Sequence, residues 1–142
     1  MYSIVRFDYA DTALFEKAIG IRTDVFVKEI HIDPKLECDE YDATAHHYLL
    51  SENNIPLATA RWRETSKGIK LERFAVPAIH RNKGLGTILL KEVLKDVIPS
   101  SKLIYLHSQH TAVNLYLKNG FKIMGDAFEE AGIKHYYMEY NK

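Results

Sequence analysis

The residues best suited to chemistry in this chain form a basic segment between a predicted strand, which ends at Val76, and a predicted helix. The first amides of a helix have no intrahelical partner, and they carry the positive end of the helix dipole. Gly84 and Gly86 would let an anion approach those amides, while Arg81 and Lys83 add positive charge. The segment therefore predicts an anion-binding site suited to a pyrophosphate.

A plainer interpretation of this segment is that its two glycines only shape a tight connection between strand and helix. The segment is not a Walker loop, which ends in Gly-Lys-Ser/Thr, nor the dinucleotide fingerprint, which needs a third glycine. Its composition alone leaves both interpretations open.

Two motifs in the chain resemble those of a known family. The Arg-x-x-Gly-x-Gly pattern after Val76 resembles the acetyl-CoA motif of the GNAT superfamily of N-acetyltransferases, with Asn82 where glycine is frequent. A helix with Tyr116 followed by Gly120 and Phe121 resembles a second GNAT element. Four further segments resemble a subgroup of small bacterial GNAT proteins: Arg22-x-x-Val25-Phe26-Val27-x-Glu29, Asp39-Glu40-Tyr41-Asp42 with His46, Ala60-Arg61, and Glu130-x-Gly132-Ile133-x-His135.

The resemblance implies one GNAT domain over residues 1–142 and acetyl-CoA as co-substrate. The fold of that family is α/β, with a mixed, mostly antiparallel seven-stranded sheet and helices on both faces. The residues expected at the coenzyme are Phe74, Val76, Arg81, Asn82, Lys83, Gly84, Leu85, Gly86, Thr87 and Asn114.

Acetyl transfer from a thioester to an amine requires an acid for the departing thiolate, a donor for the developing oxyanion and a neutral amine. The resemblance implies that Tyr116 is the acid, and that a backbone amide near Val76 faces the oxyanion where two strands part. Such a preorganised amide typically contributes a few kcal/mol to transition-state stabilisation. The alternative for Tyr116 is a core tyrosine, flanked on its helix by Leu115 and Leu117.

Glu72 is the first candidate for the general base. It lies on the strand that resembles the one with a catalytic glutamate in some GNAT members, and strand alternation predicts that it shares a face with Phe74 and Val76. The alternative is that Glu72 forms an ion pair with Arg61 or Arg73.

His135 is the second candidate, on the last predicted strand, and His107 lies on an earlier strand. The histidine side chain changes charge near neutral pH, which suits a base. The alternatives are that both histidines are structural, or that water takes the proton.

Arg22 falls between Ile19 and Phe26 on the apolar stripe of the first predicted helix. A buried guanidinium needs an acceptor, so we expect it to pair with Glu29 or with a carboxylate of the acidic segment 31–44. The other acids of that segment are either solvated surface or attract a cationic amine.

Hydrophobic periodicity and turn signals supply the framework that must position these residues. Asp11 is the expected N-cap of the first helix, Gly20 is expected to break or bend that helix, and Asn53-Asn54 is the expected turn of a hairpin. The predicted strands are residues 3–7, 46–50, 56–63, 69–76, 103–106, 121–124 and 133–140, and the later helices are residues 84–97 and 111–118. This order implies a mixed sheet with helices on both faces.

Composition narrows the class of protein further. Over 142 residues, 19 Lys and Arg balance 19 Asp and Glu, which gives no general attraction to nucleic acid. One cysteine, Cys38, excludes an intrachain disulfide, and no metal site is visible. Neither a secretory signal nor a membrane-spanning stretch is visible, so we expect a cytoplasmic protein. We expect no membrane or nucleic-acid partner. Homodimers are common in the family that the chain resembles, so a homodimer is a possible assembly.

The sequence therefore favours an acetyl-CoA-dependent N-acetyltransferase that acts on a primary amine of a small molecule. A different class is a GNAT-like module that binds CoA as a sensor or scaffold without turnover. The presence of Tyr116 favours the enzyme.

Overall fold

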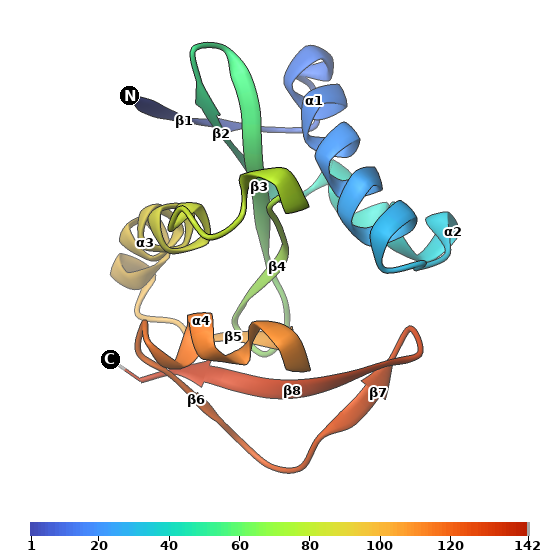
Figure 1. The fold of residues 1–142 in the computed structure, drawn as a ribbon. Coiled ribbons are helices and arrows are strands. Elements are labelled where there is room, and N and C mark those ends of the chain that lie inside the picture. The colour runs from blue at the N-terminus through green and yellow to red at the C-terminus, as the bar shows by residue number, and fades with distance from the viewer. Residues whose placement is uncertain (142) are drawn as a thin grey trace.

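The computed structural model describes residues 1–141 and places their strands in one eight-stranded sheet (Figure 1). The strands are β1 (Tyr2–Phe7), β2 (His46–Glu52), β3 (Ile55–Glu64), β4 (Ile69–Ala75), β5 (Ile104–Gln109), β6 (Phe121–Ile123), β7 (Phe128–Glu130) and β8 (Ile133–Tyr140). The α-helices are α1 (Thr12–Arg22), α2 (Pro34–Glu37), α3 (Leu85–Val97) and α4 (Val113–Leu117). The expected domain extends to Lys142, which lies outside the described residues.

The sheet has the order β1-β2-β3-β4-β5-β8-β6, and β7 pairs with β8. Only β4 and β5 pair in parallel, because α3 crosses over between them. The predicted α/β class, with a mixed and mostly antiparallel sheet, is confirmed, but the sheet has one strand more than the predicted seven. The additional strand is β7, which has three residues.

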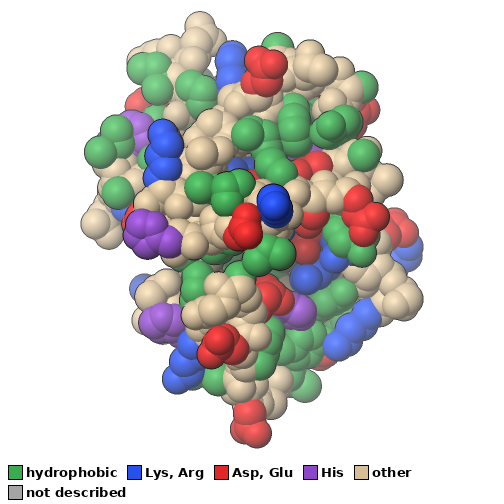
Figure 2. All heavy atoms as spheres, turned by 90° about the vertical axis from the view of Figure 1, so that its right-hand side faces the viewer, with side chains coloured by type: hydrophobic (Ala, Val, Ile, Leu, Met, Phe, Trp, Pro, Cys, Tyr) green, Lys and Arg blue, Asp and Glu red, His purple; other side chains and the backbone are tan. Residues whose placement is uncertain are grey.

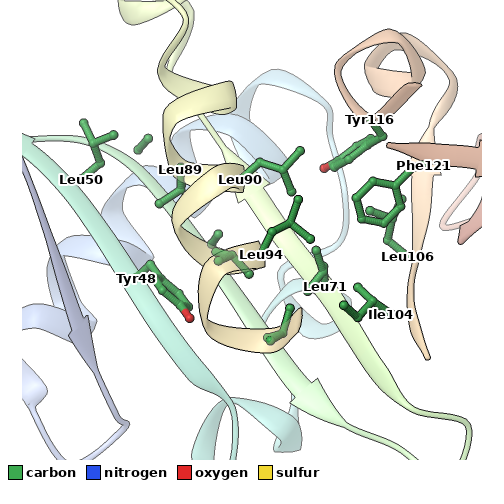
Figure 3. Close-up of a cluster of buried hydrophobic side chains, with 14 of the residues drawn as sticks. Tyr48, Leu50, Leu71, Leu89, Leu90, Leu94, Ile104, Leu106, Tyr116 and Phe121 are labelled. Carbon is green, nitrogen blue, oxygen red and sulfur yellow. The ribbon is translucent and has the colours of Figure 1, made fainter. Parts of the chain in front are cut away.

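One face of the sheet is covered by α3 and α4 (Figure 3). The predicted apolar stripe of α3 is buried against β2, β3 and β4, and Tyr116 of α4 and Phe121 extend the same core toward β8. The buried members of the stripe are Leu85, Leu89, Val93 and Val97. The helix prediction over 84–97 therefore holds to within one residue.

The opposite face is covered by α1 and the segment that follows it. Ala18, Ile21 and Phe26 pack there with Phe7 and Leu49, so the prediction of helices on both faces is confirmed. The expected N-cap is also confirmed, since the carboxylate of Asp11 accepts a hydrogen bond from the Leu14 amide at 3.1 Å.

Gly20 is expected to break or bend the first helix, and the break does not occur. The helix runs through Gly20 to Arg22 and continues as a π-helical segment, Thr23–Glu29. Ala18 and Ile21, on either side of the glycine, are buried, and this packing holds the helix together despite the low helix propensity of glycine. The Asn53-Asn54 hairpin is confirmed, with φ values of 51° and 64° that fit a tight type I′ turn.

A bulge in β4 decides where its side chains point. Arg73 has a φ of 57°, in the left-handed region, and the pairing of β4 with β3 shifts register at this point. Leu71 and Phe74 both pack in the core beneath α3, whereas Glu72 joins arginines on the opposite face. The expectation that Glu72 shares a face with Phe74 and Val76 is therefore wrong, because the bulge interrupts the alternation.

Candidate active site

A groove of about 1170 Å³ opens where β4 and β5 part. The two strands pair only over residues 69–71 and 104–106, although β4 continues to Ala75 and β5 to Gln109. Beyond the last pair, Leu71 with Leu106, the facing edges have no strand partner, and their backbone groups line the groove. Figure 2 looks at this side of the molecule and shows a furrow between an upper and a lower part, with charged and histidine side chains along it.

The first turn of α3 lies at one end of the groove. Gly84 is the N-cap residue, with a φ of 77° and no side chain that caps the helix, so the first amides of α3 face the groove without an acceptor among residues 1–141. A Cβ on Gly84 would contact nothing within 4 Å, which leaves its backbone conformation as the reason for glycine. Gly86 differs, because a Cβ there would lie 3.4 Å from Leu115 of α4.

Asn82 adopts a φ of 64° in the same loop. Asparagine tolerates the left-handed conformation better than most residues, so Asn82 can take a conformation that favours glycine.

Arg81 is held in place by two contacts. Its Nε donates to the Val76 carbonyl at 2.8 Å, and its two Nη atoms donate to the Glu29 carboxylate, both at 2.6 Å. The guanidinium thereby fixes the loop to the end of β4 and to the π-helical segment. Much of the positive charge expected from Arg81 is balanced by Glu29.

Tyr116 is almost fully buried, with 6% of its surface exposed, and lies between Phe74 and Phe121 in edge-to-face contacts. Its ring extends from α4 toward α3 (Figure 3), and the residue lines the groove. Its hydroxyl makes no hydrogen bond within residues 1–141, and no buried side-chain N or O atom there lacks a partner, so the hydroxyl oxygen is accessible from the groove. Burial raises the pKa of the Tyr116 phenol, which keeps it protonated at neutral pH.

Glu72 lies in a cluster of cations. Its carboxylate is within 3.0 Å of Arg61, 2.8 Å of Arg63 and 3.2 Å of Lys70. Burial alone would raise the pKa of Glu72, but these three cations outweigh it and hold the pKa below its usual range. Glu72 is therefore a carboxylate that stays ionised and fully engaged, as the ion-pair alternative anticipated.

The acidic segment is folded onto the sheet by buried arginines. Arg22 contacts Glu37 and Asp42, which confirms the expected pair with this segment, and Arg61 contacts Asp39 and Asp42. Arg22 and Arg61 are 1% and 0% exposed, so both guanidinium groups depend on these acceptors. Three carboxylates of the segment are thus ion-paired with arginines.

His135 lies in β8 on the groove, with 5% of its surface exposed. Its Nδ1 donates to the Ile133 carbonyl at 2.7 Å, which leaves Nε2 as the acceptor atom of the neutral ring. His107 of β5 lines the same groove, on the same side of the sheet.

The groove brings together the expected site residues except Lys83 and Asn114, which are exposed and do not line it. Sequence reasoning missed Arg63, Arg73 and Glu130 as groove residues. The Glu130-to-His135 motif was an available signal for Glu130. Nothing in the sequence marks the bulge at Arg73.

Comparison with known proteins identifies the class that this fold and groove define. The family model for the acetyltransferase (GNAT) domain matches residues 8–142, and the chain belongs to this family of acyltransferase enzymes. It is 32% identical over 123 residues to the uncharacterized N-acetyltransferase YjcF of Bacillus subtilis, with 85% of this chain and 88% of YjcF covered. It is 36% identical over 129 residues to the uncharacterized protein YyaT of the same organism, with 86% and 85% covered.

Solved structures show the same fold. Escherichia coli ElaA superposes with a TM-score of 0.89 at 23% identity, covering 99% of this chain and 100% of ElaA. A GNAT family acetyltransferase from Elizabethkingia anophelis, solved with acetyl-CoA bound, gives a TM-score of 0.68 at 19% identity, covering 97% and 94%.

Over residues 1–141, no helix has the length and apolar character needed to cross a membrane. The same residues contain no group of three or more His, Cys, Asp or Glu side chains arranged to hold a metal ion.

Proposed function

We propose that the protein transfers the acetyl group of acetyl-CoA directly to a primary amine of a small molecule. The observation that carries this proposal is the position of the uncapped α3 N-terminus beside the parted ends of β4 and β5, in one groove. Family membership and the acetyl-CoA bound to the Elizabethkingia relative support the same choice of donor.

The groove residues suit two parts of acetyl-CoA, its diphosphate and its extended amide chain. The free amides of α3 suit a diphosphate, since Gly84 leaves open space where a side chain would stand. The unpaired edge of β4 beyond Leu71 offers backbone donors and acceptors to an extended amide chain, as a strand partner would. Phe74, Val76, Asn82, Leu85, Gly86 and Thr87 complete the proposed coenzyme contacts in the groove.

When bound, acetyl-CoA would supply an activated acetyl thioester. Tyr116 is proposed to donate a hydrogen bond or proton to the leaving sulfur, because its hydroxyl is protonated, accessible from the groove and without a hydrogen-bond partner among residues 1–141. A backbone amide on the free edge of β4 is proposed to stabilise the oxyanion. The amine proton is assigned to His135, whose Nε2 is an acceptor, in preference to Glu72, which is held by three cations.

Thiol release tests the proposal. Purified protein is incubated with acetyl-CoA and a library of primary amines, and free CoA thiol is measured. The expected result is amine-dependent release for at least one aliphatic amine, with the acetylated amine found by mass spectrometry. Thermal stabilisation by acetyl-CoA without release for any amine would instead identify a non-catalytic CoA-binding module.

A further inference from the structure

Glu130 differs from every other carboxylate on the groove. Over the described part of the chain, the other groove carboxylates each form an ion pair with an arginine: Glu29 with Arg81, Glu37 with Arg22, Asp39 with Arg61, and Glu72 with Arg61 and Arg63. Glu130 has only two imidazoles within ion-pair distance, and 47% of its side chain is exposed. It is therefore the groove carboxylate whose charge remains open to a cationic ligand.

A tight hairpin places Glu130 between the two histidines. β7 ends at Glu130 and β8 starts at Ile133, and the two turn residues, Ala131 and Gly132, have φ values of 52° and 76°. The hairpin is formed by β7 and β8 (Figure 1), and four of its residues line the groove: Glu130, Ala131, Ile133 and His135. Phe128 pairs with His135 across this hairpin, and Glu130 pairs with Ile133. Because strand side chains alternate, Glu130 lies on the same face of the hairpin as His135.

The two imidazoles contact the carboxylate differently. His107 Nδ1 lies 3.0 Å from Glu130 Oε1, a normal hydrogen-bond distance. His135 Nε2 lies 3.7 Å from Oε2, which is too long for a hydrogen bond. Because His135 Nδ1 already donates to the Ile133 carbonyl, Nε2 of the neutral ring presents a lone pair toward a carboxylate oxygen.

These two facing acceptors need a donor between them. A primary ammonium has three N–H bonds, so it can donate to Oε2 and to Nε2 together. The phenyl ring of Phe128 packs against both histidines, at 5.9 Å from the His135 ring and 5.2 Å from the His107 ring, and shields the pair on one side. Lys70 of β4 is the cation whose charge also acts on Glu130.

We propose that Glu130, with His107 and His135, is the docking site for the ammonium group of the acceptor, which makes a cationic aliphatic amine the substrate class. This assignment rests on the proposed acetyl transfer for its role, but the binding itself does not require acetyl-CoA. The ammonium donates one N–H to Glu130 Oε2 and one to His135 Nε2. Transfer of the second proton to Nε2 breaks that N–H bond, gives an imidazolium beside the carboxylate and leaves a neutral amine with a free lone pair.

The test uses methylammonium, the smallest primary ammonium, and tetramethylammonium, which has the same charge but no N–H donor. Each salt is titrated into the intact protein at pH 7, and the His107 and His135 ring signals are followed by proton–carbon NMR. We expect saturable shifts with methylammonium and about tenfold weaker binding of tetramethylammonium. Wild-type protein without a saturable shift, or with equal affinity for the two cations, would overturn the assignment.

Glu130→Gln keeps the size of the side chain and removes its charge, and Glu129→Gln is the matched control. Glu129 is the exposed neighbour on β7, opposite Lys134. We expect Glu130→Gln to lose the methylammonium shifts and Glu129→Gln to keep them, with acetyl-CoA affinity unchanged in both. Retention of binding in a folded Glu130→Gln protein contradicts the docking role. Failure of acetyl transfer alone would leave this NMR result intact, so the two proposals fail separately.

Discussion

At the scale of single residues, Tyr116 has separate atoms for its packing in the core and for its proposed role as the acid. Its ring belongs to the core between Phe74 and Phe121, whereas its hydroxyl has no bond to the described residues and belongs to the groove. Core packing and the proposed acid chemistry would therefore act through different atoms of the same side chain, and removal of the hydroxyl alone can separate them.

Tyr116→Phe is expected to lower kcat by about 100-fold, within the range typical of general acids, and to leave the KM for acetyl-CoA nearly unchanged. The free energy of unfolding should change by less than about 0.5 kcal/mol, because no protein hydrogen bond is lost. Steady-state thiol release and urea unfolding measure the two effects. Tyr136→Phe is the control, since Tyr136 packs on the same core but does not line the groove. Unchanged turnover in Tyr116→Phe would remove the acid role.

For Glu72 we expect a loss of stability and not a loss of the catalytic base. Glu72→Gln takes a charge partner from buried Arg61, which retains Asp39 and Asp42, so the free energy of unfolding should fall by about 2 kcal/mol. The acidic limb of the pH dependence of kcat/KM should persist. Glu64→Gln, at an exposed pair with Lys102, should leave stability nearly unchanged. Loss of the acidic limb in Glu72→Gln alone would restore Glu72 as the base.

At the scale of elements, the sequence was informative where a local rule acts alone. The stripe of α3, the Asp11 N-cap and the Asn53-Asn54 turn each depend on a few neighbouring residues, and each is confirmed. The bulge at Arg73 could not be predicted, because an arginine in the left-handed region is held by distant partners, the Leu36 and Glu37 carbonyls and Asp39. Because the bulge was not predicted, the face of the sheet on which Glu72 lies was predicted wrongly.

The α3 N-terminus gives a matched pair of glycine variants. Gly84 and Gly125 have φ values of 77° and 92°, and a Cβ on either would meet nothing within 4 Å. Gly84→Ala and Gly125→Ala should therefore each lower stability by about 1 kcal/mol through backbone strain. Only Gly84→Ala places a methyl group beside the free amides of α3, so only this variant should weaken acetyl-CoA binding, by about tenfold. Calorimetric titration with acetyl-CoA measures the difference, and equal affinities would contradict the diphosphate site.

At the scale of the whole molecule, one ionic cluster joins parts of the chain that are far apart in sequence. Asp42 accepts from Arg22 at the end of α1 and from Arg61 in β3, and Arg61 reaches Glu72 in β4. The acidic segment thereby borders the groove on the side of α2. Composition could not predict this position, because a run of acidic residues is typical of a solvated surface. For the acidic segment, an arginine partner was predictable only at Arg22, whose place on an apolar stripe demanded an acceptor.

This cluster should make the protein sensitive to acid. Burial alone would raise the pKa of Asp42, but the hydrogen bond from Arg22 and the charges of Arg22 and Arg61 hold it below its usual range, and the pKa values of Asp39 and Glu72 are lowered by the same balance. A carboxyl whose pKa is lower in the folded state stabilises the fold above its unfolded pKa. That stability is lost as the pH falls through the folded pKa, so unfolding free energy should decline below about pH 5.

Asp42→Asn should therefore lower the free energy of unfolding by about 3 kcal/mol at pH 7, because two buried guanidinium groups lose the negative charge of a shared carboxylate. The difference between variant and wild type should shrink as the pH is lowered, since protonation removes the same charge from the wild type. Urea unfolding across the acid range measures both effects. Asp24→Asn, at an exposed pair with Lys28, is the control and should match wild type throughout. A constant difference between Asp42→Asn and wild type at every pH would show that Asp42 stabilises the fold by its shape and hydrogen bonds, and not by its charge.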